Sequence, residues 1–189
     1  MIIDLLRHGA THALPGQLRG RSDDALTPEG WQQMRAASHS GHWQAIASST
    51  LARCSDFARE LAQTRQLPIH LDARLAELDF GHWEGRSISE LLQNPTSADL
   101  LRAFWSDPWR NPPPDGESMT DFAARILAAL RELSGHHAGQ RVLLITHGGV
   151  IRFLLAHARR PPPDALASFD VPHASLHRID TTRLFTDPA

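Results

Sequence analysis

Two histidines occupy matching positions in the sequence. His8 and His147 each directly follow an apolar run and directly precede a glycine, and Arg7 stands beside His8. A neutral imidazole can attack phosphorus and hold a phosphoryl group covalently, while a guanidinium group binds phosphoryl oxygens through a planar pair of N–H donors. Glycine lets the backbone turn sharply and lets a ligand approach closely. The combination predicts an anion-binding site with a nucleophile, although either histidine alone is also typical of a loop residue with satisfied hydrogen bonds.

Strands must position these two histidines. The apolar runs at residues 1–6 and 141–146 predict buried strands that end just before His8 and His147. Further strands are expected at residues 43–48, 68–71, 167–171 and 175–179, and helices at 51–61, 119–133, 148–156 and after the run Thr27-Pro28-Glu29. This alternation predicts an α/β fold, a three-layer α/β/α sandwich with a mostly parallel sheet. Parallel neighbours would bring both histidines to the same edge, where ligands bind in such folds.

The stretch between residues 77 and 115 interrupts the alternation. It contains polar, tryptophan-containing helical patterns and ends near the breaker Asn111-Pro112-Pro113-Pro114-Asp115-Gly116. We expect this stretch to form a small helical cap insert within a single domain that spans residues 1–189.

Composition narrows the classes of function. A formal net charge of -2 argues against a nucleic-acid or anionic-membrane partner, and the only cysteine, Cys54, cannot form an intrachain disulfide. No apolar run is long enough to span a bilayer, and the first residues lack the basic region of a signal peptide, so a cytoplasmic protein is expected. No metal-ligand spacing occurs, and we expect no metal, no cofactor and a small-molecule partner, with a monomer or homodimer as the assembly.

The motifs together resemble the histidine phosphatase superfamily, in the branch that contains the cofactor-dependent phosphoglycerate mutases. The run Leu6-Arg7-His8-Gly9-Ala10-Thr11 is similar to the family's first motif. Four further segments follow in the family's order: Ser48-Ser49-Thr50-Leu51-Ala52-Arg53, Leu75-Ala76-Glu77-Leu78-Asp79-Phe80-Gly81, Gly116-Glu117-Ser118 and Thr146-His147-Gly148-Gly149-Val150-Ile151-Arg152. One such motif is a weak signal, but five in order across one domain are strong.

The resemblance implies a role for each matching residue. His8 would be the nucleophile that forms a phosphohistidine, and Glu77 would be the acid that protonates the leaving group. Arg7, Arg53 and His147 would bind the phosphoryl oxygens together with His8. The arginines would carry the positive charge that a magnesium ion carries in other phosphoryl-transfer enzymes.

One position departs from the family pattern. An asparagine that contributes to phosphate binding commonly lies six positions after the nucleophilic histidine, where this chain has Leu14. A leucine side chain cannot hydrogen-bond, so either Gln17 or Ser22 substitutes or phosphate binding is weaker. Thr11, in the first motif, is a further candidate for substrate binding.

The insert also resembles a particular subfamily. The run Phe80-Gly81-His82-Trp83-Glu84-Gly85-Arg86 and the later Trp105-Ser106-Asp107-Pro108 are similar to α-ribazole phosphatases of cobalamin biosynthesis. That resemblance implies α-ribazole 5'-phosphate as the substrate, with Trp83 as part of an aromatic wall for the leaving group. The tryptophans Trp83, Trp105 and Trp109 are equally typical of packing within a helical insert.

Three other functions remain open from the sequence. The protein could be a broad-specificity phosphatase, or a phosphoglycerate mutase of the same fold that returns the phosphoryl group to a second hydroxyl. It could instead be a non-catalytic binding module that keeps the fold, although such a protein would be expected to lose His8, an arginine or Glu77, and all are present.

Overall fold

The computed structural model describes residues 1–14, 16–159 and 169–185. These residues form a five-stranded sheet with the order β3-β2-β4-β1-β5. Its strands are β1 (Ile2–Arg7), β2 (Ala45–Ser48), β3 (Ile69–Leu71), β4 (Arg141–Thr146) and β5 (Leu176–Asp180). The pairs β1–β4, β2–β4 and β2–β3 are parallel, and only β5 is antiparallel to its neighbour β1. The prediction of a mostly parallel sheet is confirmed.

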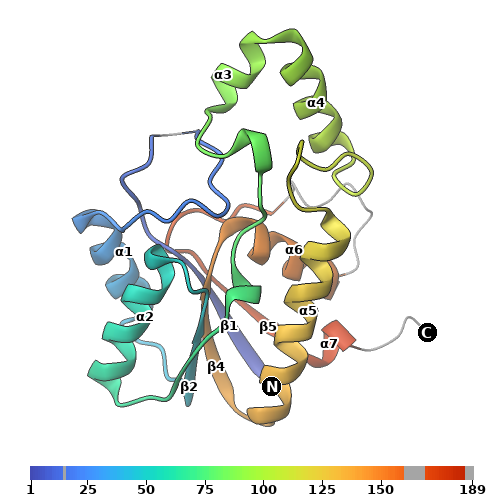
Figure 1. Ribbon diagram of the computed structural model, residues 1–189. Helices are drawn as coiled ribbons and strands as arrows, with labels where there is room; N and C mark the ends of the chain where they lie inside the picture. The colour runs from blue at the N-terminus through green and yellow to red at the C-terminus, as the bar shows by residue number, and fades with distance from the viewer. Residues whose placement is uncertain (15, 160–168, 186–189) are drawn as a thin grey trace.

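Helices cover both faces of the sheet, as Figure 1 shows, so the predicted three-layer α/β/α sandwich is also confirmed. One face carries α1 (Pro28–Ser38) and α2 (Ala52–Arg65). The other face carries α5 (Met119–His136), α6 (Gly148–Arg159) and the short α7 (Thr182–Phe185).

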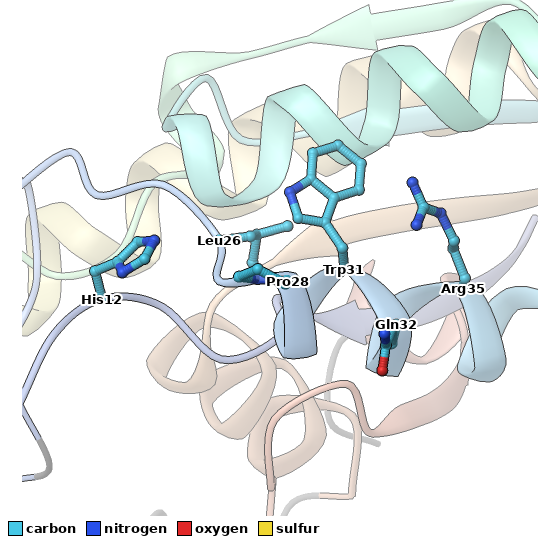
Figure 2. Close-up of a pocket in the computed structure, with 6 residues that line it drawn as sticks. All are labelled: His12, Leu26, Pro28, Trp31, Gln32 and Arg35. Atoms are coloured by element: carbon cyan, nitrogen blue, oxygen red, sulfur yellow. The ribbon is translucent and has the colours of Figure 1, made fainter.

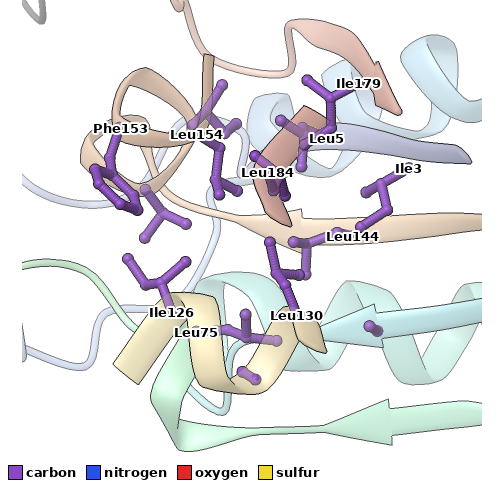
Figure 3. Packing of buried hydrophobic residues seen from close by; sticks show 14 of the residues in the cluster. Ile3, Leu5, Leu75, Ile126, Leu130, Leu144, Phe153, Leu154, Ile179 and Leu184 are labelled. Atoms are coloured by element: carbon purple, nitrogen blue, oxygen red, sulfur yellow. The ribbon is translucent and has the colours of Figure 1, made fainter. Parts of the chain in front are cut away.

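The alternation of side chains along each strand separates two hydrophobic clusters. In β4, Leu144 lies in the cluster that α5, α6 and α7 complete, and Figure 3 shows it among the side chains Ile3, Leu5, Ile126, Leu130 and Leu154. Its neighbour Leu143 lies in the opposite cluster, together with residues of α1 and α2 such as Met34 and Phe57. Successive strand residues therefore face opposite helical layers, which is why the residues of β4 between Arg141 and Thr146 are all apolar.

The start of α1 follows the expectation from its sequence. Thr27 is the N-cap, and its side-chain oxygen accepts a hydrogen bond from the backbone N–H of Gly30 at 3.0 Å. Pro28 takes the first turn, where a missing N–H costs nothing, and Glu29 lies near the positive end of the helix dipole. This capped helix ends the loop that runs from the end of β1.

The pairing of β1 with β4 brings the two histidines together. Arg7, the last residue of β1, pairs with Thr146, the last residue of β4. The backbone N–H of His8 then donates to the carbonyl of Thr146 at 3.0 Å. His8 and His147 therefore leave the same edge of the sheet one step beyond paired residues.

The segment between β3 and α5 leaves the sheet after the 3-10 turn η1 (Ala73–Leu75). It forms a second 3-10 turn, η2 (Gly81–Trp83), and the helices α3 (Ile88–Gln93) and α4 (Pro95–Ser106). In Figure 1, α3 and α4 lie beyond the end of the sheet at which β1 and β4 finish. Three buried side chains, Trp83, Leu91 and Leu101, give this insert a small cluster of its own.

One expected strand is absent from the described residues. Residues 169–171 have no strand, and residues 167–168 of that expected element lie outside the described ranges. None of the helices in the described ranges is long and apolar enough to cross a membrane.

Candidate active site

The imidazole of His8 is held in one orientation by its own backbone neighbour. His8 is buried, and its Nδ1 lies 2.9 Å from the carbonyl oxygen of Gly9. A carbonyl can only accept, so Nδ1 carries the proton and the lone pair of the neutral ring lies on Nε2. Burial, with the positive charges of Arg53 and Arg7 nearby, holds the pKa of His8 well below its usual range. The ring is therefore neutral near pH 7 and has a free nucleophilic nitrogen.

His147 faces His8 across the site. The centroids of the two rings are 5.4 Å apart, and His147 is fully buried. Its Nδ1 lies 3.2 Å from the donor Nε of Arg53, and its Nε2 lies 2.9 Å from Oγ of Ser49. Burial and the charge of Arg53 lower the pKa of His147 well below its usual range. Both imidazoles are thus neutral and fixed in place.

Arg53 reaches the site from the first turn of α2. The residue is only 1% exposed, and its guanidinium donates to the carbonyl oxygens of Ser22 at 2.5 Å and Gly20 at 2.8 Å, in addition to His147. These three bonds use three of the five N–H donors of an arginine, which leaves two for a ligand. A loop before α1 therefore holds this cation rigidly against the paired histidines.

Arg7 supplies a second cation with an unused donor. Its Nη1 donates to the carbonyl of Val171 at 2.6 Å, whereas its Nε is buried without a hydrogen-bond partner among the described residues. Burial lowers the pKa of Arg7, with Arg152 and Arg53 contributing like charge and Glu77 opposing them. Like charges drawn together around an unsatisfied buried donor are the arrangement that an anion stabilises.

Glu77 follows η1 in the chain, and its carboxylate reaches the start of α6. Its Oε2 accepts from the backbone N–H of Gly149 at 2.8 Å, and its Oε1 accepts from the N–H of Leu78 at 3.0 Å. A Cβ at Gly149 would overlap the Glu77 carboxylate, so only glycine leaves room for this approach.

A second arginine network fixes the backbone of Glu77. Arg125 of α5 donates to the carbonyl oxygens of Ala76 at 2.7 Å and Glu77 at 2.9 Å. The same guanidinium binds the carboxylate of Glu117 with two bonds of 2.5 and 2.8 Å. Glu117 belongs to the Gly116-Glu117-Ser118 run, so this part of the sequence holds Glu77 in place through Arg125.

A pocket of about 440 Å³ opens from Glu77 toward the insert. Arg152 and Gly149 share its Glu77 end, while its other walls are mostly apolar: Leu18, Leu78, Phe80, Ile88, Phe104, Trp105, Pro108, Met119 and Phe122. A second pocket, shown in Figure 2, lies along α1 between His12 and Arg35 and contains none of the histidines or arginines of the site. Of these two pockets, the one at Glu77 borders the site, because Glu77, Gly149 and Arg152 line it.

The other candidate residues have different surroundings. Thr11 pairs through its backbone with Leu26, and the Gln17 side chain accepts a hydrogen bond from the N–H of Leu14 at 3.0 Å. Ser22 donates its hydroxyl to Glu84 at 2.7 Å, and the side chain of Leu14 is 69% exposed. In this arrangement the Ser22 hydroxyl is used by Glu84, and the amide oxygen of Gln17 is used by the backbone of Leu14.

Trp83 lies inside the insert and not along the pocket. It is 2% exposed, and its ring packs edge-on against Phe104 with centroids 5.6 Å apart. Trp105, which is 49% exposed, is the tryptophan that lines the pocket. The pocket therefore has an aromatic surface, to which Trp105 contributes together with Phe80, Phe104 and Phe122.

Sequence reasoning missed two residues near the histidines. The ring of His173 lies 5.5 Å from that of His8, and the backbone N–H of the next residue, Ala174, donates to the carbonyl of His8 at 3.2 Å. Arg152 lies at the pocket wall and donates to the carbonyl of Phe169 at 3.2 Å. Arg152 is the last residue of the motif that begins at Thr146, so the sequence could have indicated it. His173 could not be found in this way, because only the antiparallel pairing of β5 with β1 brings it close to His8.

Within the described ranges, no group of three or more His, Cys, Asp or Glu side chains could hold a metal ion. The charges that face the histidines are guanidinium groups. The arrangement can therefore bind a phosphoryl group through N–H donors, present a neutral imidazole to phosphorus and offer a carboxylate on the side of the pocket.

Several known proteins are similar to this chain in sequence and in fold. An "Adenosylcobalamin/alpha-ribazole phosphatase" of Escherichia coli (strain K12) is 30% identical over 186 residues, 96% of this chain and 90% of the relative. A "Probable phosphoglycerate mutase GpmB" of Enterobacter sp. (strain 638) is 32% identical over 180 residues, 93% of this chain and 83% of the relative. The solved structure of Bacillus stearothermophilus YhfR superposes with a TM-score of 0.85 at 32% identity, covering 95% of this chain and 90% of that one.

The sequence profile of the histidine phosphatase superfamily (branch 1) matches residues 3–184, nearly the whole chain. The matched span includes both histidines, the arginines around them and Glu77. The chain therefore belongs to branch 1 of the histidine phosphatase superfamily and is a phosphatase.

Proposed function

We propose that the protein hydrolyses a phosphomonoester in two steps through a phosphohistidine at His8. Nε2 of His8 attacks phosphorus, an N–P bond forms, and the ester P–O bond breaks. Glu77 gives its proton to the departing alkoxide oxygen. In the second step Glu77 takes a proton from water, the water oxygen attacks phosphorus, and the N–P bond breaks to release inorganic phosphate and neutral His8.

One observation supports this proposal more than any other, namely the unpaired donor on Arg7. Its buried Nε lacks a partner among the described residues while the cations Arg53 and Arg152 lie nearby. A bound phosphoryl group would satisfy that donor and neutralise the repulsion between the guanidinium groups. Because these groups are fixed before the substrate binds, they would stabilise the developing charge on the equatorial oxygens without reorganisation.

We propose α-ribazole 5'-phosphate as the substrate. The pocket beyond Glu77 is large enough for an organic leaving group, and Trp105 and Phe104 line it together with aliphatic side chains. An aromatic ring of the leaving group could stack there, which is worth about 1–3 kcal/mol for a base on an aromatic side chain. The relative from Escherichia coli that carries this substrate in its name covers 96% of the chain, which supports the same choice.

A phosphoglycerate mutase is the second candidate, because a relative with that name is 32% identical. A mutase must hold an acidic three-carbon substrate and keep water from the phosphohistidine. The apolar walls of the pocket fit a ring better than they fit a carboxylate, although Arg152 at its inner end could bind an anion.

The deciding experiment compares kcat/KM for α-ribazole 5'-phosphate, 3-phosphoglycerate and p-nitrophenyl phosphate under one set of conditions, with inorganic phosphate as the readout. We expect the ribazole ester to be better than 3-phosphoglycerate, which has no ring, by about 10- to 100-fold, as stacking of its ring predicts. Equal values for the three esters would remove the substrate assignment and leave a broad-specificity phosphatase. Transfer of the phosphoryl group between the hydroxyls of phosphoglycerate, faster than its release, would favour the mutase.

A further inference from the structure

Glu84 lies at the end of the turn η2 in the insert, yet its carboxylate reaches the loop before α1. Oε1 accepts from the backbone N–H groups of Gly20 at 2.9 Å, Arg21 at 3.0 Å and Phe80 at 3.2 Å. Oε2 accepts from the N–H of Ser22 at 3.3 Å and from its hydroxyl at 2.7 Å. Five donors therefore converge on one carboxylate, and three successive residues of the loop contribute four of them.

The same loop holds Arg53 from its other side. The carbonyl oxygens of Gly20 and Ser22 accept from Nη2 and Nη1 of Arg53 at 2.8 and 2.5 Å. Both residues thus direct their N–H groups toward Glu84 and their carbonyl groups toward Arg53. The anion of Glu84 and the cation of Arg53 are joined through residues 20–22, which we call the strap.

The contacts of Gly20 show that the strap packs closely against the insert. A Cβ at Gly20 would overlap both the carbonyl oxygen of Leu78 and Oε1 of Glu84. Only glycine permits this approach, so the position of the strap is set by contact as well as by hydrogen bonds. Leu78 follows Glu77 directly, and the strap therefore also borders the backbone of the acid.

We propose that Glu84 is a positioning residue for phosphate binding: its carboxylate orients the strap so that the strap's carbonyl oxygens hold the Arg53 guanidinium at the phosphate site. The role rests on the proposed function, because it concerns the same phosphate site. Every partner of Glu84 is a donor, so both of its oxygens must accept. Glutamine has the same shape but replaces one acceptor by an NH₂ group, which would face N–H or O–H donors of the strap.

The test measures the binding of inorganic phosphate by titration calorimetry to the wild type, Glu84→Gln and the control Glu90→Gln. Glu90 lies on α3, and its exposed carboxylate pairs with Arg86 of the insert, so its variant should bind like the wild type. We expect Glu84→Gln to weaken phosphate binding by about tenfold or more, as the loss of charge-assisted bonds predicts. KM should rise by the same factor for a poor and a good leaving group, because the change affects the phosphate end alone.

A double-mutant cycle with Arg53→Lys separates this role from a structural one. If Glu84 acts through Arg53, the Glu84→Gln change should weaken phosphate binding much less in the Arg53→Lys background than in the wild type. Equal losses in both backgrounds would overturn the proposal, as would a lowered melting temperature with unchanged phosphate affinity.

Two further measurements cover the case in which Glu84→Gln does not fold and separate this proposal from the proposed function. If Glu84→Gln does not fold, Ser22→Ala removes only the hydroxyl bond to Glu84 and should give a smaller loss in the same direction; no loss would overturn the role. Binding does not require turnover, so a wild type that hydrolyses no phosphomonoester would contradict the proposed function, whereas equal phosphate affinity in the wild type and Glu84→Gln would contradict the role of Glu84.

Discussion

Nε of Arg53 lies 3.2 Å from Nδ1 of His147, a contact between two buried side chains, one from the first turn of α2 and one from the end of β4. An arginine can only donate, so Nδ1 must accept and the proton of the neutral ring lies on Nε2, which faces Ser49. In His8 the proton lies on the opposite nitrogen, since Nδ1 donates to Gly9. The two histidines therefore have different tautomers, and only His8 has an exposed lone pair on Nε2. This difference predicts unequal chemical roles for two residues that look alike in the sequence.

The first prediction concerns the phosphorylated intermediate. His8→Ala should abolish turnover and also remove an acid-labile phosphoenzyme, because the proposed mechanism holds the phosphoryl group on Nε2 of His8. His147→Ala should slow turnover by about 10²- to 10³-fold, as loss of one fixed electrostatic partner does, while some labelling persists. Quenched labelling with a ³²P-phosphomonoester, followed by acid and base stability of the label, checks both variants. Normal hydrolysis by His8→Ala would refute the mechanism.

The second prediction concerns protonation of the leaving group by Glu77. Glu77→Gln should lower kcat for an alkyl phosphate by about 10²- to 10⁴-fold, because an alkoxide must be protonated as it leaves. The loss should be small for p-nitrophenyl phosphate, whose leaving group departs as a stable anion. Initial rates on both esters give the answer, with Glu90→Gln as the matched surface control. Equal losses on the two substrates would exclude the acid role.

The third prediction uses the close approach of Glu77 to α6. Gly149→Ala places a methyl group where the Glu77 carboxylate lies, so the carboxylate must move and lose its bond from the Gly149 N–H. The variant should reproduce the leaving-group dependence of Glu77→Gln while it still binds inorganic phosphate. Gly135→Ala is the control, because a Cβ there meets no atom within 4 Å. If Gly149→Ala hydrolyses alkyl phosphates at the wild-type rate, this placement of the acid is wrong.

The fourth prediction is a dependence of stability on pH. In the folded chain the pKa of His8 lies well below its usual value of about 6.5, whereas in the unfolded chain the imidazole takes up a proton near that value. The unfolded state therefore binds more protons as the pH falls below about 6.5, and stability decreases. If His8 stays neutral in the folded chain throughout this range, it alone should lower the free energy of unfolding by at most about 1.4 kcal/mol between pH 7.5 and 5.5. The buried His147 shifts in the same direction and should add a similar loss.

Urea denaturation at pH 7.5, 6.5 and 5.5 measures this effect. His8→Gln should lose less stability than the wild type as the pH falls, and His8→Gln/His147→Gln should lose less still. His42→Gln, a substitution at an exposed site, should follow the wild-type curve. Parallel curves for the wild type and His8→Gln would show that the imidazole of His8 is not kept neutral by burial.

The parts of the fold that could be predicted are those set by local pattern. The apolar run before His147 predicted β4 with the same bounds, and Thr27 predicted the start of α1. Matching strand ends also predicted that His8 and His147 lie together, because parallel pairing requires only that β1 and β4 be neighbours. These predictions require only the pattern of apolar residues along the chain and the identity of the residue that follows each strand.

Other parts of the site depend on how backbone N–H groups of one segment face side chains of a segment that is distant in the sequence. Glu84 and Ser22 are 62 residues apart, and no local pattern shows that a carboxylate of the insert faces the N–H groups of that loop. For the same reason Ser22 was a candidate for contacting phosphate directly, whereas its hydroxyl bonds Glu84. Trp83 and Trp105 likewise cannot be told apart by residue type, since burial within the insert depends on how α3 and α4 pack.

The final prediction concerns selectivity and follows from that packing. Trp105 lines the pocket beside Glu77, whereas Trp109, which is 43% exposed, is not among the residues that line it. If the leaving group of α-ribazole 5'-phosphate stacks on Trp105, Trp105→Ala should lower kcat/KM for that ester by about 10- to 100-fold, the equivalent of a lost stacking contact. A phosphomonoester without a ring, such as glycerol phosphate, should lose less than about threefold, because the phosphate end is unchanged. Trp109→Ala is the matched control and should behave as the wild type on both esters. A uniform loss on both esters in Trp105→Ala would mean that this tryptophan supports the packing of α4 and does not contact the substrate.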